Sequence, residues 1–281
     1  MGNQLKTAVL LSVLTCLIIW SGNMLGGQGG MVVAFFFAVG INFFSYWFSD
    51  KIILKMYGAQ EATRAEAPEL YAVVQKLAGA AALPMPKIYI ISSDSPNAFA
   101  TGRNPEHAAV AVTSGILRLL NNEELEGVIA HELAHIHNRD ILIGTIAAVL
   151  AGAITMIAGM ARWAFILGGM SRDDEGDGGG LGVLVLAVLA PLAAMIIQLA
   201  VSRTREYLAD ATGARFAGTS AGLARALEKL EYSAKRSPLQ ANPSTAHMFI
   251  VKPFSGNAIT ALFSTHPPVE KRVARLRELP C

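Results

Sequence analysis

Residues 131–135 read His-Glu-Leu-Ala-His and lie inside a longer stretch, 123–139, whose sequence predicts an α-helix. Asparagines at the expected helix start are good N-caps, and the glutamates after them favour the positive end of the helix dipole. A helix turns once per about 3.6 residues, so His131 and His135 lie on one face, where they are able to hold one metal ion. Leucine, isoleucine and valine give the same helix an apolar side for a core. The stretch therefore predicts a helix that is packed on one side and presents a metal site on the other.

Glu132 stands beside the first histidine, where a carboxylate can take a proton from a water molecule on the metal. The pattern H-E-x-x-H on a helix is typical of zinc metallopeptidases. A catalytic zinc ion has three protein ligands and one open position, so a third ligand is expected further along the chain. Glu132 is accordingly the expected general base of a peptidase site.

Glu206 is the best candidate for the third ligand. Glu206 and Asp210 are four residues apart and share one face of a predicted helix. Asp210 is placed to accept a hydrogen bond from the second nitrogen of a zinc-bound histidine, and Arg203 and Arg205 to orient the group or balance its charge. A solvated helix with ordinary charge pairs explains the same spacing equally well.

Composition separates this chain from ordinary soluble proteins. Hydrophobic residues make up 53% of the 281 residues and charged residues 16%, against about 25% charged in a typical soluble protein. The net charge of +2 does not indicate a nucleic-acid surface. Four runs lack any charged side chain: 7–22, 31–48, 141–161 and 181–201.

A bilayer-spanning helix needs about 20 apolar residues, so these runs predict four transmembrane helices. The first two runs pair as a hairpin across residues 23–30. A signal peptide explains the first run alone, but the second run follows at once. For the last two runs, the alternative is a buried hairpin of a soluble core; their small residues suit close packing in lipid.

Lysine and arginine mark the cytoplasmic ends of membrane helices. Such residues flank one side of all four runs, whereas the loop 23–30 is uncharged and the loop 162–180 is mostly acidic. We therefore expect the N-terminus and the segments 49–140 and 202–281 in the cytoplasm.

The segment between the second and third runs predicts a small sheet beside helices. A helix is expected around 68–81, strands at 87–92 and 108–113, and a short extended or looped piece at 98–101. The predicted fold is mainly α with an α+β part: four transmembrane helices and a cytoplasmic, zincin-like metallopeptidase domain with a small β-sheet. The expected divisions are a transmembrane hairpin, the first catalytic part, a second hairpin and the second catalytic part, at 1–50, 51–140, 141–201 and 202–281.

Taken together, the motifs resemble the HtpX-type integral-membrane zinc metallopeptidases, relatives of the CAAX prenyl endopeptidases. The resemblance is carried by His131-Glu-Leu-Ala-His135, Asn138-Arg139-Asp140, Ser202-Arg203, Glu206-Tyr-Leu-Ala-Asp210, Pro96-Asn97-Ala-Phe-Ala-Thr-Gly102 and Thr265-His266-Pro267. It covers most of the chain and is weakest in the first two apolar runs and at the C-terminus. The resemblance implies that His131, His135 and Glu206 hold one zinc ion per chain and that Asp210 supports a ligand.

The same resemblance implies a zinc metalloendopeptidase of the bacterial inner membrane, multi-pass, with its site facing the cytoplasm. Its expected substrates are misfolded or damaged membrane proteins, and its expected partners are these proteins and the lipid bilayer, without nucleic acid; a homo-oligomer stays open. A prenyl-protein processing protease is the first alternative, disfavoured because the chain has only four apolar runs. A metal-binding membrane scaffold is the second, and it has no need of Glu132.

Further residues complete the expected site. Asn97, Ala98 and Phe99 begin a stretch that is suited to bind an extended substrate backbone along a sheet edge. The alternative is an ordinary connection between the sheet and a turn. His266 is expected to stabilise the oxyanion, the alternative being a loop histidine that caps the last helix. The basic stretch 271–277 is expected to be a solvated helix face or to touch anionic lipid headgroups.

Overall fold

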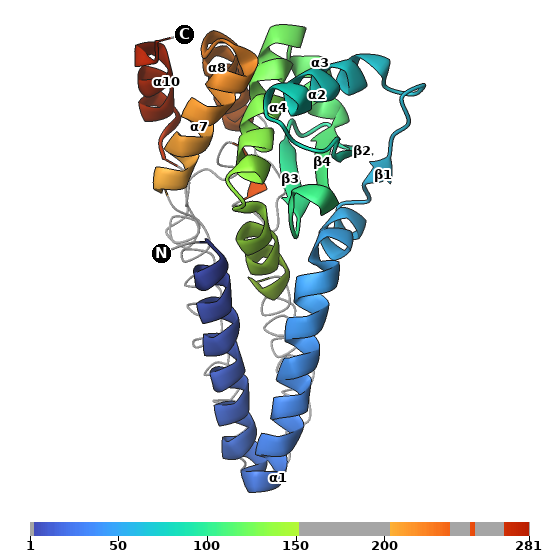
Figure 1. Ribbon diagram of the computed structural model, residues 1–281, viewed down its shortest axis with the longest axis vertical. Helices are drawn as coiled ribbons and strands as arrows, with labels where there is room; N and C mark the ends of the chain where they lie inside the picture. Colours follow the sequence, from blue (N-terminus) through green and yellow to red (C-terminus); the bar gives the residue numbers. More distant parts are fainter. Residues whose placement is uncertain (1–2, 152–202, 237–247, 251–266, 281) are drawn as a thin grey trace, which may run out of the picture.

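The computed structural model of the chain describes residues 3–151, 203–236, 248–250 and 267–280. Two parts are visible in Figure 1: a long helical hairpin, and a packed body of helices around a small sheet. The body is mostly helical and contains one small sheet, as the sequence predicted; the sheet is mixed.

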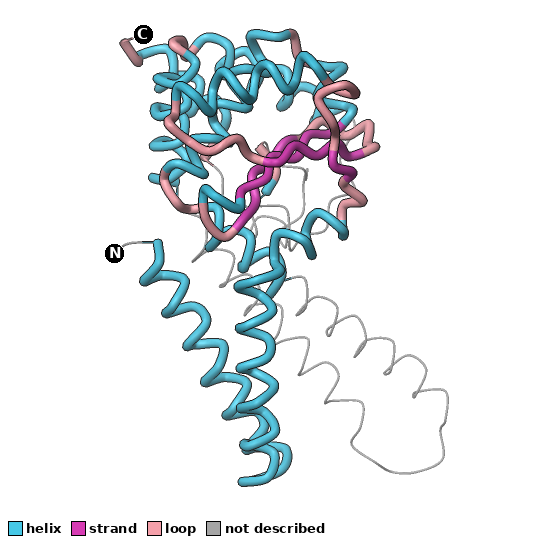
Figure 2. Tube along the Cα trace, turned by 45° about the vertical axis from the view of Figure 1, so that its right-hand side comes forward, coloured by secondary structure: helices cyan, strands magenta, loops and turns pink. Residues whose placement is uncertain are grey.

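Helix α1 (Asn3–Met56) folds back on itself as two arms (Figures 1 and 2). The break is at Gly26 and Gly27, inside the stretch 23–30, and Gly27 has φ 56°, which only a residue without a β-carbon adopts readily. The Asn42 side-chain amide donates to the Thr15 hydroxyl at 2.7 Å and ties the arms together. The second arm, Gly26–Met56, is long and apolar enough to cross a membrane.

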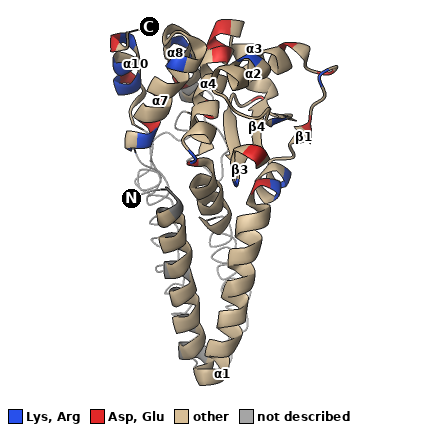
Figure 3. Ribbon diagram, viewed as in Figure 1, with Lys and Arg blue, Asp and Glu red and all other residues tan. Residues whose placement is uncertain are grey.

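The other predicted membrane runs are described only in part. A shorter apolar helix, Ile141–Ala151, begins the third run. The rest of that run and the whole of 181–201 lie outside the described residues. Figure 3 shows that the charged residues of the described part gather on the body and at the end of α1 next to it, while the arms of α1 are almost free of them.

The sheet has four strands in the order β1-β2-β4-β3. Strands β1 (Gln60–Glu61) and β2 (Lys87–Ile91) are antiparallel, β2 and β4 (Ala108–Thr113) are parallel, and β4 and β3 (Ala98–Gly102) are antiparallel. The strands expected at 87–92 and 108–113 are thus present within one residue. The piece at 98–101 is a true strand, and it forms one edge of the sheet.

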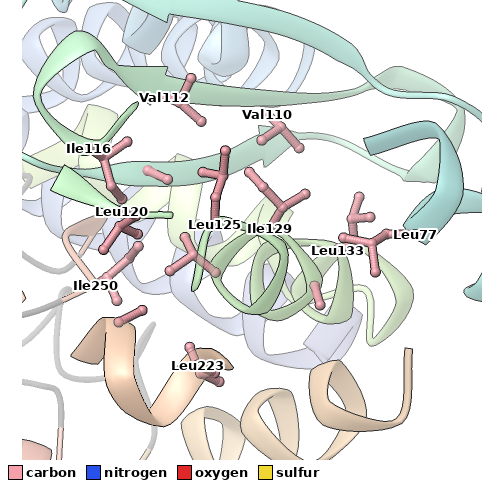
Figure 4. Packing of buried hydrophobic residues seen from close by; sticks show 14 of the residues in the cluster. Leu77, Val110, Val112, Ile116, Leu120, Leu125, Ile129, Leu133, Leu223 and Ile250 are labelled. Carbon is pink, nitrogen blue, oxygen red and sulfur yellow. The ribbon is translucent and has the colours of Figure 1, made fainter. Parts of the chain in front are cut away.

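Helix α4 (Asn122–His137) lies at the centre of the body. Ile129 and Leu133 of α4 lie toward the sheet and α2 (Pro68–Ala80) (Figure 4). Helix α4 also packs against α8 (Ala221–Arg236), whose Leu223 is fully buried. The remaining described elements are the 3₁₀ turn η1 (Pro105–His107) and the helices α3 (Ser114–Leu119), α7 (Arg203–Ala217) and α10 (Val269–Glu278).

Local chemistry fixes both ends of α4. Asn121 caps its start: the Asn121 side chain accepts from the Glu124 amide, and the Glu124 carboxylate accepts from the Asn121 amide. The helix ends at His137, and two residues later Arg139 has φ 55°, a left-handed conformation that turns the chain. Asp140 follows, and the apolar helix Ile141–Ala151 starts directly after it. The metal-binding segment and the start of the third apolar run are therefore joined without a linker.

Candidate metal centre

Two helices bring the three predicted ligands together. His131 and His135 come from α4, and Glu206 comes from the first turns of α7. The two helices touch closely at Gly213, where a β-carbon would lie 2.9 Å from the His131 backbone nitrogen. This close approach holds the start of α7 against the face of α4 that carries the histidines.

The three side chains converge on one point. The Nε2 atoms of His131 and His135 are 3.2 Å apart, and each lies 3.8 Å from an oxygen of Glu206. Ligand atoms about 2.0–2.2 Å from a tetrahedral zinc ion are roughly 3.3 Å apart. The three candidate ligand atoms all lie within 4.8 Å of one another, and two imidazoles with one carboxylate suit Zn²⁺.

Each imidazole is held from behind by a carboxylate. His131 Nδ1 lies 3.0 Å from Asp210 Oδ1, and His135 Nδ1 lies 3.1 Å from both oxygens of Asp140. A carboxylate on Nδ1 keeps the proton there and leaves the Nε2 lone pair free. Both Nε2 atoms are thus prepared to bind a cation, and this feature distinguishes the pair from two histidines that happen to share a helix face.

The charge of the centre also calls for a cation. Burial disfavours the charged imidazole of His135, but the carboxylates of Asp140, Glu206 and Glu132 outweigh it and raise the pKa of His135 to about 10. Burial likewise opposes ionisation of Asp210, yet Arg272 and His131 lower the pKa of its carboxyl to about 2. The carboxylates that raise the pKa of His135 would equally favour a metal ion at this place.

Glu132 lies beside the ligands and is itself buried, with 5% of its surface exposed. Its Oε2 accepts a hydrogen bond from the Ala100 amide of the edge strand β3 at 2.8 Å. Burial is the main cause that raises the pKa of the Glu132 carboxyl. A carboxylate with a raised pKa, fixed in place by a backbone donor, is well suited to accept and return a proton.

Arg272, from α10, is completely buried against the centre. Its Nε and Nη2 atoms donate to the two oxygens of Asp210 at 2.9 and 2.6 Å. Its Nη2 atom is nearly equidistant from the two ring nitrogens of His131, at 3.5 and 3.4 Å. The expectation that 271–277 forms a solvated or lipid-facing basic face is therefore wrong at this position.

The other predicted site residues have different placements. Arg203 is exposed, whereas Arg205 is half-buried and interacts electrostatically with Asp140 and Glu206, so Arg205 rather than Arg203 faces the centre. Asn97, Ala98 and Phe99 are buried at the start of β3. His266 lies outside the described residues.

Asp140 and Arg272 have roles at the centre that the sequence reasoning missed. Asp140 stands in a stretch that was noted only for its resemblance, five residues after His135, and no helical spacing links the two. A signal for Arg272 was present: α10 buries Val269, Arg272, Val273 and Leu276, so the arginine occupies a position of the apolar face. An arginine on such a face needs a buried partner.

Comparisons with known proteins identify the family of this chain. The pattern that defines peptidase family M48 matches residues 64–280. A protease HtpX homolog from Desulforapulum autotrophicum is 60% identical over 278 residues, covering 99% of this chain and 90% of that protein. One from Pyrococcus furiosus is 55% identical over 280 residues, covering 99% of this chain and 96% of that one. A crystal structure of Ste24p from S. mikatae aligns with a TM-score of 0.52 and 19% identity; the alignment covers 98% of this chain and 64% of that one, and shows a shared fold alone.

Proposed function

Since this chain belongs to peptidase family M48 and is a metalloprotease, we propose that it is a zinc-dependent endopeptidase held in a cell membrane, with His131, His135 and Glu206 as the zinc ligands. The family resemblance seen in the sequence is confirmed by these matches. One observation supports the ligand assignment above all: two Nε2 atoms and a carboxylate converge while separate carboxylates hold both Nδ1 atoms.

The chain's own residues divide the chemistry among themselves. A zinc ion at this site would polarise the scissile carbonyl and stabilise the charge that develops on its oxygen. Glu132 takes a proton from the attacking water and delivers it to the leaving amine. Asp140 and Asp210 keep the imidazoles of His135 and His131 in the tautomer that offers Nε2.

We propose that substrate binds along the outer edge of β3. This strand is an edge of the sheet, and its Ala100 amide points away from β4 toward Glu132. Because backbone directions alternate along a strand, the Ala98 backbone also points away from β4, toward the side on which we propose that an extended peptide pairs.

His266 remains our proposed oxyanion donor. Its support is its place in the sequence, three residues before α10, the helix that brings Arg272 to the centre. Removal of one such donor typically costs about 10²–10³ in kcat.

Removal of the metal is the direct test of the proposed function. Purified protein in detergent is expected to cleave casein or a quenched fluorescent peptide. A chelator should abolish this cleavage, and stoichiometric zinc should restore it, because the ligand set holds one ion per chain. A serine-protease inhibitor serves as the control and should have no effect. Cleavage that persists after complete removal of zinc would contradict the proposal.

The membrane arrangement that we propose has four spans and a cytoplasmic site. Its support is the apolar arm Gly26–Met56 of α1, with exposed phenylalanines along it, and the apolar helix Ile141–Ala151 that leaves the metal centre. The lysines and arginines that flank the four apolar runs give the orientation. A site at the membrane surface suits membrane proteins as substrates, and damaged ones offer the extended segments that β3 would bind.

Orientation is testable with the two natural cysteines, Cys16 and Cys281. In a Cys16→Ser background, an impermeant maleimide is expected to label Cys281 in inverted vesicles and not in intact cells. A second variant lacks Cys16 and Cys281 and carries Asp174→Cys; its new cysteine should be labelled in intact cells and not in inverted vesicles, because the loop 162–180 is proposed to lie outside. If the cysteines at positions 281 and 174 are labelled from the same side, this arrangement is excluded.

Two alternatives are weaker. A prenyl-processing role rests on the likeness to Ste24p, which at 19% identity concerns the fold alone. A scaffold without catalysis conflicts with membership of a peptidase family and with a buried Glu132 held beside the ligands.

A further inference from the structure

We propose that Asn97 is a positioning residue for the metal ligand His131, acting through Ile250, Arg272 and Asp210. This inference rests on the proposed function, since it needs His131 to bind the metal. It assigns to the Asn97 side chain a role other than contact with substrate.

The backbone of Asn97 is fixed by the neighbouring strand. Its carbonyl accepts from the Thr113 amide at 2.9 Å, and its amide donates to the Thr113 hydroxyl at 2.9 Å. Both residues are buried, with 3% and 5% of their surface exposed. The backbone that carries the Asn97 side chain is therefore fixed in place, one residue before β3 begins.

From that point a continuous set of hydrogen bonds runs to the metal ligand. Asn97 Oδ1 accepts from the Ile250 amide at 3.3 Å, and the Ile250 carbonyl accepts from Arg272 Nη1 at 3.0 Å. Arg272 donates to both oxygens of Asp210, whose Oδ1 lies 3.0 Å from His131 Nδ1. Every member of the set is buried.

Burial explains why the far end depends on Asn97. A buried arginine needs partners for its remaining donors as well as its carboxylate, and the Ile250 carbonyl is one of them. The Ile250 amide in turn has to be paired, because a buried N–H without a partner is costly. If Asn97 loses its acceptor, the backbone at Ile250 has reason to move, and Arg272 then loses the carbonyl that helps to hold it on Asp210.

The arrangement links two parts of the site through one strand. Ala100 of β3 donates to Glu132, and Asn97 at the start of the same strand supports His131 through the relay. The base and a metal ligand are thus fixed relative to the edge on which we propose that substrate binds. Changes in the polar support of a metal ligand typically alter metal affinity or activity by about 10–100-fold.

The test compares three variants of the full-length protein in detergent: Asn97→Ala, Asn97→Asp and Asn104→Ala. Asn97→Ala removes the acceptor, and Asn97→Asp keeps an oxygen at the same place. Asn104 is the matched control, because it flanks the other end of β3 and its side chain caps η1 by accepting from the His107 amide at 3.0 Å. The readouts are the zinc dissociation constant, by chelator competition, and kcat and KM on one peptide.

Asn97→Ala is expected to weaken zinc binding by about 10-fold or more and to lower kcat more than it raises KM. Asn97→Asp is expected to lie closer to wild type, and Asn104→Ala to equal it. In an Asp210→Asn background, Asn97→Ala should add little further loss of zinc affinity, since both changes act on the same relay.

The outcomes separate the two levels of the argument. If the wild-type protein binds no zinc, the proposed function fails together with the inference. If the wild type binds zinc and folded Asn97→Ala binds it equally well, or if its loss adds fully to that of Asp210→Asn, the inference alone is overturned. Should Asn97→Ala fail to fold, Asn97→Asp decides: affinity near wild type supports the relay, and affinity lost in the folded variant overturns it.

Discussion

Glu132→Gln is expected to lower kcat by about 10³-fold or more while zinc stays bound, because general acid–base catalysis contributes typically 10²–10⁴-fold. Glutamine has the same shape and keeps an oxygen for the Ala100 amide, so the fold and the metal ligands should be unchanged. The measurement is cleavage of a quenched peptide by the purified variant, together with its zinc content by metal analysis.

Glu126→Gln is the matched control for this change. Glu126 is on the same helix and pairs with Lys76 at the surface, away from the ligands. Its replacement should leave kcat within about twofold, as expected for an exposed ion pair. If Glu132→Gln, purified away from other proteases, cleaves at more than a tenth of the wild-type rate, Glu132 is not the general base.

Arg272→Leu is expected to destabilise the body by about 3–5 kcal/mol, because it leaves Asp210 buried without its cation. For a folded unit of this size, such a loss lowers the melting temperature by roughly 10 °C. The measurement is thermal unfolding in detergent, followed by near-ultraviolet circular dichroism. Arg277→Leu, on the same helix but in an exposed pair with Glu228, is the control and should change the melting temperature little.

The loss of stability in Arg272→Leu is expected to depend on pH and to become smaller in acid. Because Arg272 and His131 lower the pKa of Asp210 to about 2, its ionised form stabilises the fold above its ordinary pKa near 4. That contribution is lost as the pH falls from about 4 toward 2. The difference between wild type and Arg272→Leu should therefore shrink over this interval. If the difference in stability between wild type and Arg272→Leu is the same at pH 7 and pH 2, the ion pair between Arg272 and Asp210 is not the cause of the destabilisation.

The parts of the fold that local sequence determines were predictable. The start of α4 follows from Asn121 and Glu124, which form a reciprocal cap, and the break in α1 falls at glycines between two apolar runs. The strands β2 and β4 follow from short apolar runs bounded by turn residues. In each case the deciding residues are neighbours in the chain.

The parts of the site that depend on distant contacts were less accessible. Arg272 meets Asp210 across 62 positions of sequence, and although its place on the apolar face of α10 indicates burial, nothing local to that helix identifies the partner. The choice between Arg203 and Arg205 depends on how α7 is rotated against α4, which helical spacing alone does not specify. The four membrane spans and the role of His266 stay predictions.

The connection through Arg139 between α4 and the next helix is too short to let the two helices move independently. Asp140 holds His135, and the next residue already belongs to the apolar helix Ile141–Ala151. That helix is also fastened to β3, since the hydroxyls of Thr101 and Thr145 lie 3.0 Å apart in a buried contact. A tilt of the helix Ile141–Ala151, such as a thinner or thicker bilayer would cause, would have to be accommodated at Asp140, which holds His135, or at β3, which holds Glu132. In the membrane arrangement that we propose, the thickness of the surrounding lipid would thus act directly on the geometry of the centre.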